Sequence, residues 1–260
     1  MAKSYFLAGL AVLTLSIGAC HSSQKSTTVP DAAHNSRNAL DYNGVYSGTL
    51  PCADCSGILT AIAVNADGTY EMRTRYEGKS DQMMASKGTY LWNAQGSMIS
   101  LKEEGSTQPP EHYKVGENTL TKLDMSGKTI TGNLASQYVL QKLPADLDNK
   151  KWKLIELNGK PVKPDPTSRK EPDMNFSMTE LRVWGHGGCN GYSGSFILRP
   201  GNRIAFSGMI STMMACPDMN IETQLYQVFE KADNYSMNAR KDTLSLNKAR
   251  MAPLARFVAR

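Results

Sequence analysis

The sequence predicts a mainly β protein with two small domains, and three observations support this prediction. Between residues 41 and 143, short strand-like runs alternate with turn signals, and no run of helical period competes with them. Residues 149–260 contain further short strands and one amphipathic helix. A targeting segment at residues 1–19 and a polar stretch at residues 20–40 precede both regions.

The first segment has the organisation of a bacterial lipoprotein signal. Lys3 precedes an apolar run over residues 5–17, which is shorter than the ~20 residues needed to cross a bilayer as a helix. The run ends in Ile17-Gly-Ala-Cys20, which resembles a lipobox, in which the cysteine thiol accepts the lipid. We therefore expect a signal peptide over residues 1–19 and a lipid on Cys20. The alternative is an ordinary secretory signal with a chance cysteine.

Residues 20–40 are polar, rich in small side chains and without periodicity, which predicts a flexible tether. His21 and Ser22 do not resemble an inner-membrane retention signal, and no acidic cluster follows Cys20. We therefore expect an outer-membrane lipoprotein that faces the periplasm. Its expected partners are the membrane, through the lipid, and an envelope protein. Nucleic acid is not an expected partner of an exported protein.

The region from residue 41 to 143 is predicted to be an antiparallel β-barrel. Its clearest strand, residues 69–76, alternates between Tyr70, Met72, Thr74 and Tyr76 on one face and charged residues on the other. Short strands with turns at this spacing fit a barrel or a sandwich, and the barrel is our prediction.

A distinctive segment, Leu50-Pro-Cys-Ala-Asp-Cys-Ser-Gly57, begins this domain, and Asp67-Gly-Thr-Tyr70 follows it. Together with the position after a lipoprotein tether, these residues resemble the N-terminal domain of the NlpE family, whose members are described as copper-resistance or copper-homeostasis lipoproteins. The resemblance implies a small, lipocalin-like β-barrel. It also implies a role in sensing envelope stress and metal load.

Cys52 and Cys55 are the candidate functional residues of this domain. Catalysis of the thioredoxin type needs a lowered thiol pKa, whereas Asp54 between the thiols raises it and no helix pattern follows. Structural zinc needs about four ligands, of which two cysteines supply half. A thiolate pair suits copper(I), with Met83, Met84 or His112 as a further ligand, and a short structural or redox-sensitive disulfide is the other alternative.

The second domain, residues 149–260, is predicted to be α+β, with one helix packed against a sheet. Apolar residues of 221–232 fall on one helical face, and Asp218 or Asn220 can cap the start. Asn158-Gly159 is a strong signal for a hairpin.

Three motifs of this domain resemble the META/HslJ family: Trp152-Lys-Leu, Gly188-Cys-Asn-Gly-Tyr-Ser-Gly-Ser-Phe196, and Ser211-Thr-Met-Met-Ala-Cys-Pro217 with Glu222. The resemblance implies a META-like fold with one main helix and no defined catalytic activity.

Cys189 and Cys216 are expected to form a disulfide, because four cysteines beyond Cys20 divide two and two between the domains. The chain-entropy relation gives such a bond about 3.5 kcal/mol of stabilisation. A soft metal site is the alternative, with these cysteines joined by neighbouring side chains: Met209, Met213, Met214, Met219 and His186.

No catalytic constellation is present in the sequence, so we do not expect an enzyme. Two functions remain. In the first, the protein is a lipoprotein for envelope stress sensing or copper homeostasis, with Cys52 and Cys55 as the copper- or redox-responsive site. In the second, it is a structural or interaction lipoprotein whose cysteine pairs serve only as disulfide staples. Copper(I) is the one cofactor that the sequence suggests.

Overall fold

The computed structural model describes Met1 and residues 34–80, 82–163 and 170–260. The expected signal peptide, the lipidation site Cys20 and most of the expected tether lie outside the described residues. Residues Ala32–Arg260 form one compact unit, and the features described below lie in it. Among the described residues, no helix is long and apolar enough to cross a membrane.

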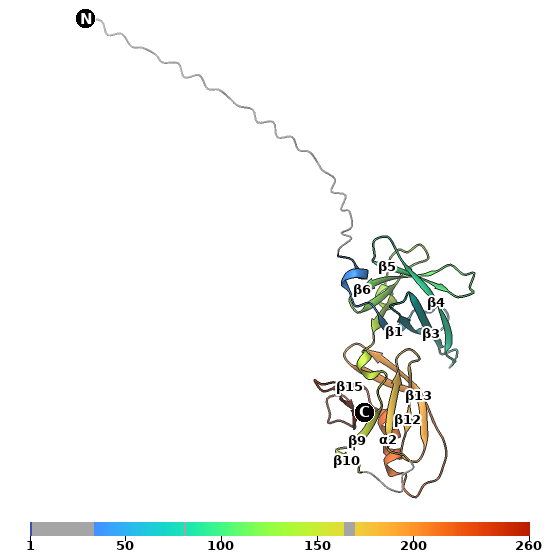
Figure 1. The fold of residues 1–260 in the computed structure, drawn as a ribbon, viewed down its shortest axis with the longest axis vertical. Coiled ribbons are helices and arrows are strands. Elements are labelled where there is room, and N and C mark those ends of the chain that lie inside the picture. Colours follow the sequence, from blue (N-terminus) through green and yellow to red (C-terminus); the bar gives the residue numbers. More distant parts are fainter. Residues whose placement is uncertain (2–33, 81, 164–169) are drawn as a thin grey trace. The chain divides into compact units, whose positions relative to one another are not determined.

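The first domain is a closed barrel of eight antiparallel strands, which confirms the predicted fold (Figure 1). Each strand pairs with the next in sequence, and β1 also pairs with β8 through Tyr46 and Lys142, which closes the ring. This up-and-down order is typical of lipocalin-type barrels. The strands are β1 (Gly44–Leu50), β2 (Gly57–Val64), β3 (Thr69–Glu77), β4 (Met84–Trp92), β5 (Met98–Glu103), β6 (Glu111–Gly116), β7 (Thr119–Lys122) and β8 (Val139–Lys142).

Alternating residues of these strands fill the barrel. On β3, Tyr70 is buried and Met72 packs beside it against the same core, as the alternation predicts. A short helix α1 (Ser36–Ala39) precedes the barrel, and a 3-10 turn η1 (Ala135–Tyr138) leads into β8. The buried core contains Tyr46, Leu50, Ile62, Val64, Tyr70, Tyr90, Ile99, Leu101, Tyr113, Val115, Leu120 and Leu140.

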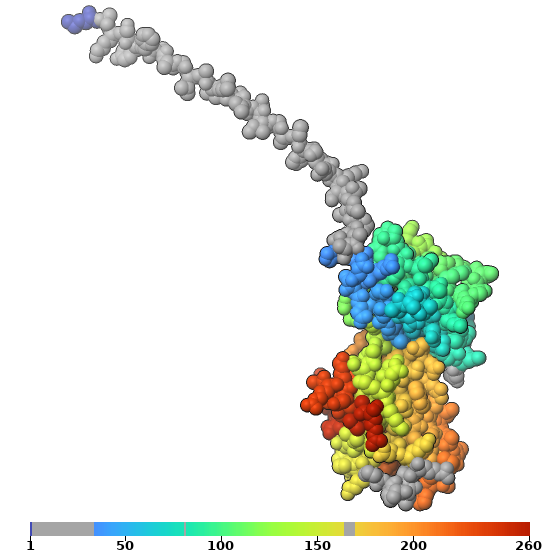
Figure 2. Space-filling model, in the orientation of Figure 1, coloured from blue at the N-terminus to red at the C-terminus, as the bar shows by residue number. Residues whose placement is uncertain are grey.

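The second domain is a nine-stranded antiparallel sheet with one helix, in agreement with the predicted mainly β fold. The last strand pairs with β9, so the start and the end of the domain lie side by side, as the yellow-green and dark red surfaces show in Figure 2. The elements are the 3-10 turn η2 (Ala145–Leu147), β9 (Trp152–Leu157), β10 (Lys160–Pro161), β11 (Asp173–Ser177), β12 (Arg182–His186), β13 (Gly191–Arg199), β14 (Arg203–Ser211), α2 (Asn220–Lys231), β15 (Asn234–Met237), β16 (Thr243–Asn247) and β17 (Ala255–Ala259).

The predicted hairpin between β9 and β10 is present. Leu157 pairs with Lys160, and the two residues between them, Asn158 and Gly159, have φ values of 50° and 76°. Positive φ at both positions is the requirement of a type I′ turn, which Asn-Gly meets with the least strain.

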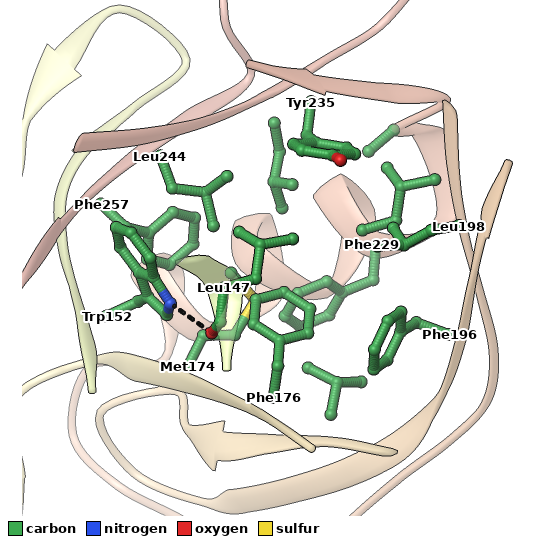
Figure 3. Packing of buried hydrophobic residues seen from close by; sticks show 14 of the residues in the cluster. Leu147, Trp152, Met174, Phe176, Phe196, Leu198, Phe229, Tyr235, Leu244 and Phe257 are labelled. Carbon is green, nitrogen blue, oxygen red and sulfur yellow. Dashed lines mark hydrogen bonds between the residues drawn. The ribbon is translucent and has the colours of Figure 1, made fainter. Parts of the chain in front are cut away.

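Large side chains fill the interior of the second domain (Figure 3). The indole Nε1 of Trp152 donates a hydrogen bond to the carbonyl oxygen of Leu147 at 3.1 Å, so the buried polar atom of this ring is satisfied. The rings of Phe176 and Phe196 meet edge to face, with centroids 5.0 Å apart. Phe229 of α2 reaches the same interior and anchors the helix to the sheet.

Candidate functional site

Cys52 and Cys55 lie in the connection between β1 and β2, at one end of the barrel wall. They are joined by a disulfide, with their Cα atoms 5.4 Å apart. Leu50 and Ile58 are the last paired residues of the two strands, so the disulfide occupies the tip of a hairpin. The segment is fastened to the neighbouring strand β3, because the Ser56 amide donates to the Glu77 carbonyl at 3.1 Å.

Gly57 permits this tight return of the chain. A Cβ atom at this position would lie 2.3 Å from Cγ2 of Thr49 on the opposite strand, which no side chain can tolerate without movement. Gly57, two residues after Cys55, therefore allows the two strands to approach closely next to the disulfide.

One carboxylate lies beside the sulfur atoms. Oδ1 of Asp54 is 3.5 Å from Sγ of Cys52, and its other oxygen forms an ion pair with Lys79 from the β3–β4 connection. The hydrogen bond and the positive charge of Lys79 lower the pKa of Asp54. Asp54 is therefore ionised at neutral pH, and its negative charge disfavours a thiolate at Cys52 once the disulfide is reduced.

These three residues are also the candidate metal ligands. Within the described ranges, the one group of at least three His, Cys, Asp or Glu side chains whose ligand atoms lie within 4.8 Å of one another is Cys52, Asp54 and Cys55. His112 does not belong to this group, and its Nδ1 lies 2.9 Å from the Ser100 hydroxyl on β5. Two sulfur donors fit copper(I) after reduction, whereas structural zinc would need about four ligands.

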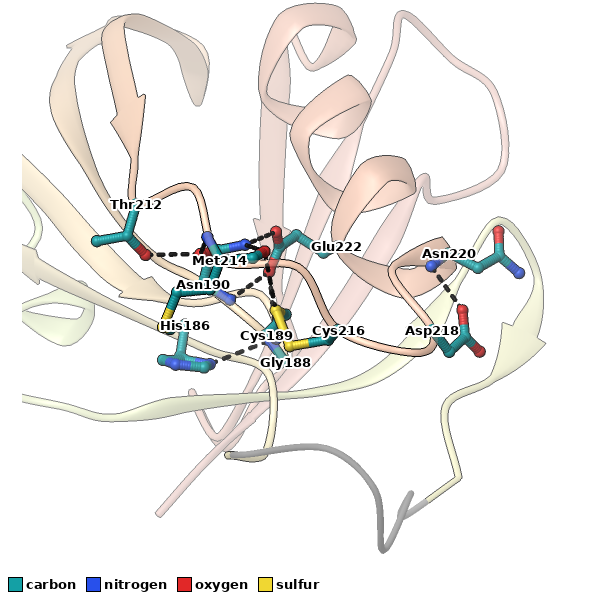
Figure 4. The surroundings of a disulfide bond; sticks show 10 residues. All are labelled: His186, Gly188, Cys189, Asn190, Thr212, Met214, Cys216, Asp218, Asn220 and Glu222. Carbon is teal, nitrogen blue, oxygen red and sulfur yellow. Dashed lines mark hydrogen bonds between the residues drawn. A yellow bond between two sulfur atoms is a disulfide. The ribbon is translucent and has the colours of Figure 1, made fainter.

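The second cysteine pair has different surroundings (Figure 4). Cys189 and Cys216 are joined by a disulfide that links the loop after β12 to the segment before α2, across 27 positions of sequence. Cys189 is buried. The alternative soft metal site needs both thiols, and the disulfide uses both sulfurs.

A buried carboxylate supports this second disulfide, and its hydrogen-bond partners were not predicted. Glu222 of α2 is 3% exposed, and its Oε2 accepts the backbone amides of Cys189 and Asn190 at 3.2 and 2.6 Å. Its Oε1 accepts the side-chain amide of Asn190 at 2.8 Å. Two signals pointed to this residue: Glu222 belongs to the motifs that resemble the META/HslJ family, and it lies on the apolar face of the helix, three positions before Leu225.

The start of α2 differs from the expected cap. The N-cap residue is Met219, which makes no side-chain capping bond. Asp218 instead accepts the backbone amide of Asn220, the first helical residue, at 2.8 Å. Asp218 therefore satisfies one free amide at the helix start, whereas Asn220 belongs to the helix itself.

Comparison with known proteins places both halves of the chain. Residues 46–133 match the NlpE N-terminal domain and residues 145–260 match the META domain. A 17 kDa lipoprotein of Treponema pallidum is 31% identical over 107 residues, which cover 38% of this chain and 69% of that protein. A Shewanella oneidensis chain of known structure, described as a lipoprotein, is 42% identical over 42% of this chain and 94% of that chain, with a TM-score of 0.38.

Lipoprotein NlpE of Escherichia coli is 27% identical over 150 residues. This alignment covers 56% of the present chain and 60% of the E. coli protein. The crystal structure of the Cpx pathway activator NlpE from E. coli is 18% identical over 65% of this chain and 90% of that chain, with a TM-score of 0.31. Both TM-scores are low, so the assignment rests on the sequence matches. The chain belongs to the NlpE family of lipoproteins, with an NlpE N-terminal domain followed by a META domain.

Proposed function

We propose that this lipoprotein senses stress in the cell envelope through its first domain, with the Cys52–Cys55 disulfide as the responsive group. The observation that carries the proposal is the position of this disulfide. Both cysteines are partly exposed at a hairpin tip, on a domain that matches the NlpE N-terminal domain. NlpE of E. coli is described as an activator of the Cpx pathway, and the signalling role proposed here follows that description.

The chemistry is a change between disulfide and dithiol. A dithiol reductant in the envelope transfers two electrons and two protons to the Cys52–Cys55 bond, which breaks to give two thiols while the reductant forms its own disulfide. The two sulfurs, freed from each other, are soft donors that select copper(I). Copper(I) is a second signal. When it is bound to the two sulfurs, they cannot form the disulfide again. Oxidant and copper thus act on the same residues.

The rest of the proposal concerns location and partner. A lipid on Cys20 holds the protein on the outer membrane, with the folded domains in the periplasm. The protein is not an enzyme, and the signal passes to an envelope protein that contacts the hairpin tip. The lipoprotein relatives support the association with the envelope.

A titration with copper(I) under a competing chelator tests the proposal. The compact unit, residues 32–260, is titrated after mild reduction and again after oxidation. We expect one copper per chain in the reduced form alone, and loss of that copper in the Cys52→Ser variant. The double variant Cys189→Ser, Cys216→Ser removes the same residue type from the other domain and should bind copper as wild type does.

A second measurement tests whether the Cys52–Cys55 disulfide responds to reductant. Mass spectrometry after graded reduction and alkylation counts the thiols at each pair. If Cys52 and Cys55 stay bonded under mild reductant and no copper binds in any state, the disulfide is a staple and the sensing function is wrong. The protein would then be a structural or interaction lipoprotein.

A further inference from the structure

A cavity of about 400 Å³ opens into the barrel near the ends of β5, β6 and β7. Tyr70 and Met72 of β3 and Leu101 of β5 line it from the inner face of the wall. Its rim is the β5–β6 connection, where Nζ of Lys102 donates to two backbone carbonyls, of Ser106 and Gln108, each at 2.8 Å. The rim is thus held in place by hydrogen bonds.

The hydroxyl of Tyr70 faces this cavity without a partner. The side chain is 2% exposed, yet among the described residues its hydroxyl makes no hydrogen bond. By contrast, the hydroxyls of the other large tyrosines of this core are bonded: Tyr46 donates to the Tyr42 carbonyl, Tyr90 to the Asn65 carbonyl and Tyr113 to Glu111. The Tyr70 hydroxyl is not one of the fully buried unpaired polar atoms of the described residues, so it is accessible from the cavity, where water or a ligand can bond it.

The charges around Tyr70 are negative. Burial, followed by the charges of Glu103 and Glu111, raises the pKa of Tyr70 to about 12. The phenol therefore remains neutral at physiological pH, and both carboxylates are near enough to act on it. The cavity wall carries three carboxylates, of Glu103, Glu111 and Asp124, against the ammonium of Lys122, so the net charge around a ligand is negative and favours a cation.

Most of the polar groups in the cavity wall already have partners. Oε2 of Glu111 accepts from the Tyr113 hydroxyl at 2.7 Å and lies 3.0 Å from Nζ of Lys122. Asp124 accepts the backbone amides of two residues of its own turn. Glu103, in contrast, has no ion pair and no side-chain hydrogen bond within the part of the chain that the structure describes. Its carboxylate and the Tyr70 hydroxyl, which have no protein partner among the described residues, can therefore bind a ligand together.

The remaining wall is apolar. It includes Met72, Leu101, Leu123 and two prolines, and Met125 at the rim is 78% exposed. An exposed methionine beside an apolar cavity is adaptable contact surface for an alkyl group.

We propose that this cavity binds a small organic ammonium ion with an alkyl body. The ammonium group donates to the Tyr70 hydroxyl oxygen and to the Glu103 carboxylate, and the alkyl body lies against the apolar wall. This site is independent of the cysteine pair and of the sensing function.

Hexylammonium is the probe, with hexanol and hexanoate as neutral and anionic molecules of the same alkyl length. At neutral pH the amine is charged, since alkyl ammonium groups titrate near pH 10. Binding of each to the 15N-labelled unit, residues 32–260, is followed by two-dimensional NMR. Hexylammonium should shift amide signals of β3, β5 and β6 and bind at least tenfold more tightly than the other two.

Two variants and one control define the site. Tyr70→Phe removes a hydrogen bond to a charged group and should weaken hexylammonium binding about tenfold. Glu103→Gln removes an exposed ion pair and should weaken it about three- to fivefold. Glu104→Gln removes the same charge one residue further on, where the side chain pairs with Lys87 outside this cavity, and should leave affinity within twofold of wild type.

Any one of three results would overturn the proposal. Hexylammonium fails to bind or binds no better than hexanol, the shifted signals lie elsewhere in the protein, or either Tyr70→Phe or Glu103→Gln binds as tightly as wild type. Glu103 is exposed, so its variant should fold even if Tyr70→Phe does not. Melting curves of both variants verify this.

Discussion

The buried carboxylate of Glu222 should be a major source of stability for the META domain. It accepts three hydrogen bonds at 2.6–3.2 Å from Cys189 and Asn190 while the residue is 3% exposed. In Glu222→Gln the shape is retained but one oxygen becomes an amide group. If the remaining oxygen keeps the two backbone amides, the new amide faces the side-chain amide of Asn190, donor to donor.

The size of the effect follows from that loss. One hydrogen bond to a charged group contributes about 1.5–3 kcal/mol, and the unsatisfied donor remains buried. Glu222 is also in the first turn of α2, where a negative charge is favourable by about 0.3–1 kcal/mol. We therefore expect Glu222→Gln to lower the free energy of unfolding of this domain by about 2–3 kcal/mol, and its melting temperature by roughly 8–13 °C.

The assay is urea denaturation followed by tryptophan fluorescence and circular dichroism, with Trp152 reporting from the core of the same domain. Glu230→Gln is the matched control, because Glu230 lies on the exposed side of the same helix and should change stability by no more than about 0.5 kcal/mol. If Glu222→Gln unfolds at the same urea concentration as Glu230→Gln, the carboxylate does not stabilise the loop, and our interpretation of its hydrogen bonds is wrong.

Three further predictions concern other groups. Replacing both Cys189 and Cys216 by serine should lower the stability of the META domain by about 3.5 kcal/mol, because the unfolded chain is no longer restricted by the bond; an unchanged urea midpoint would contradict this. Asp54→Asn removes the negative charge beside Cys52, so the reduced thiol should have a lower pKa and react faster with iodoacetamide at pH 7; an equal or slower rate would refute the electrostatic argument. Burial, the charge of Glu111 and the hydrogen bond to it raise the pKa of Tyr113 well above 10, so the neutral phenol stabilises the fold below pH 10 and this contribution is lost as the pH rises further. The Tyr113→Phe variant should show a shallower loss of stability above pH 10, and an unchanged pH profile would exclude this group as a cause.

Local patterns allowed the larger part of the fold to be predicted. Alternation marked β3, the apolar stripe marked α2, and Asn158-Gly159 marked the β9–β10 hairpin, because each signal depends on neighbours in sequence. The strand β15 was not expected, since four residues are too few for their alternation to stand out, and the strand exists through pairing with β16. The pairing of β9 with β17 could not be predicted either, because it joins residues about a hundred positions apart.

The candidate site also has features that the sequence predicts and features that only the fold creates. The spacing of Cys52 and Cys55 is visible in the sequence, and so is Asp54 between them. Lys79 could not be recognised as the partner of Asp54, because the ion pair depends on how the β1–β2 and β3–β4 connections meet at one end of the barrel. The partners of Glu222 are likewise more than thirty residues away in sequence.

The two disulfides differ in ways that suit one of them to change state. The chain-entropy relation gives a bond across 27 positions about 1.5–2 kcal/mol more stabilisation than one across three, so reduction of Cys52–Cys55 sacrifices less stability. Cys189 is also buried beside the Glu222 carboxylate, which hinders an attacking thiolate, whereas the hairpin tip is open to solvent. A reductant should therefore reduce the disulfide of the NlpE domain first, while the Cys189–Cys216 disulfide of the META domain stays intact. A switch at Cys52–Cys55 can thus operate without unfolding either domain.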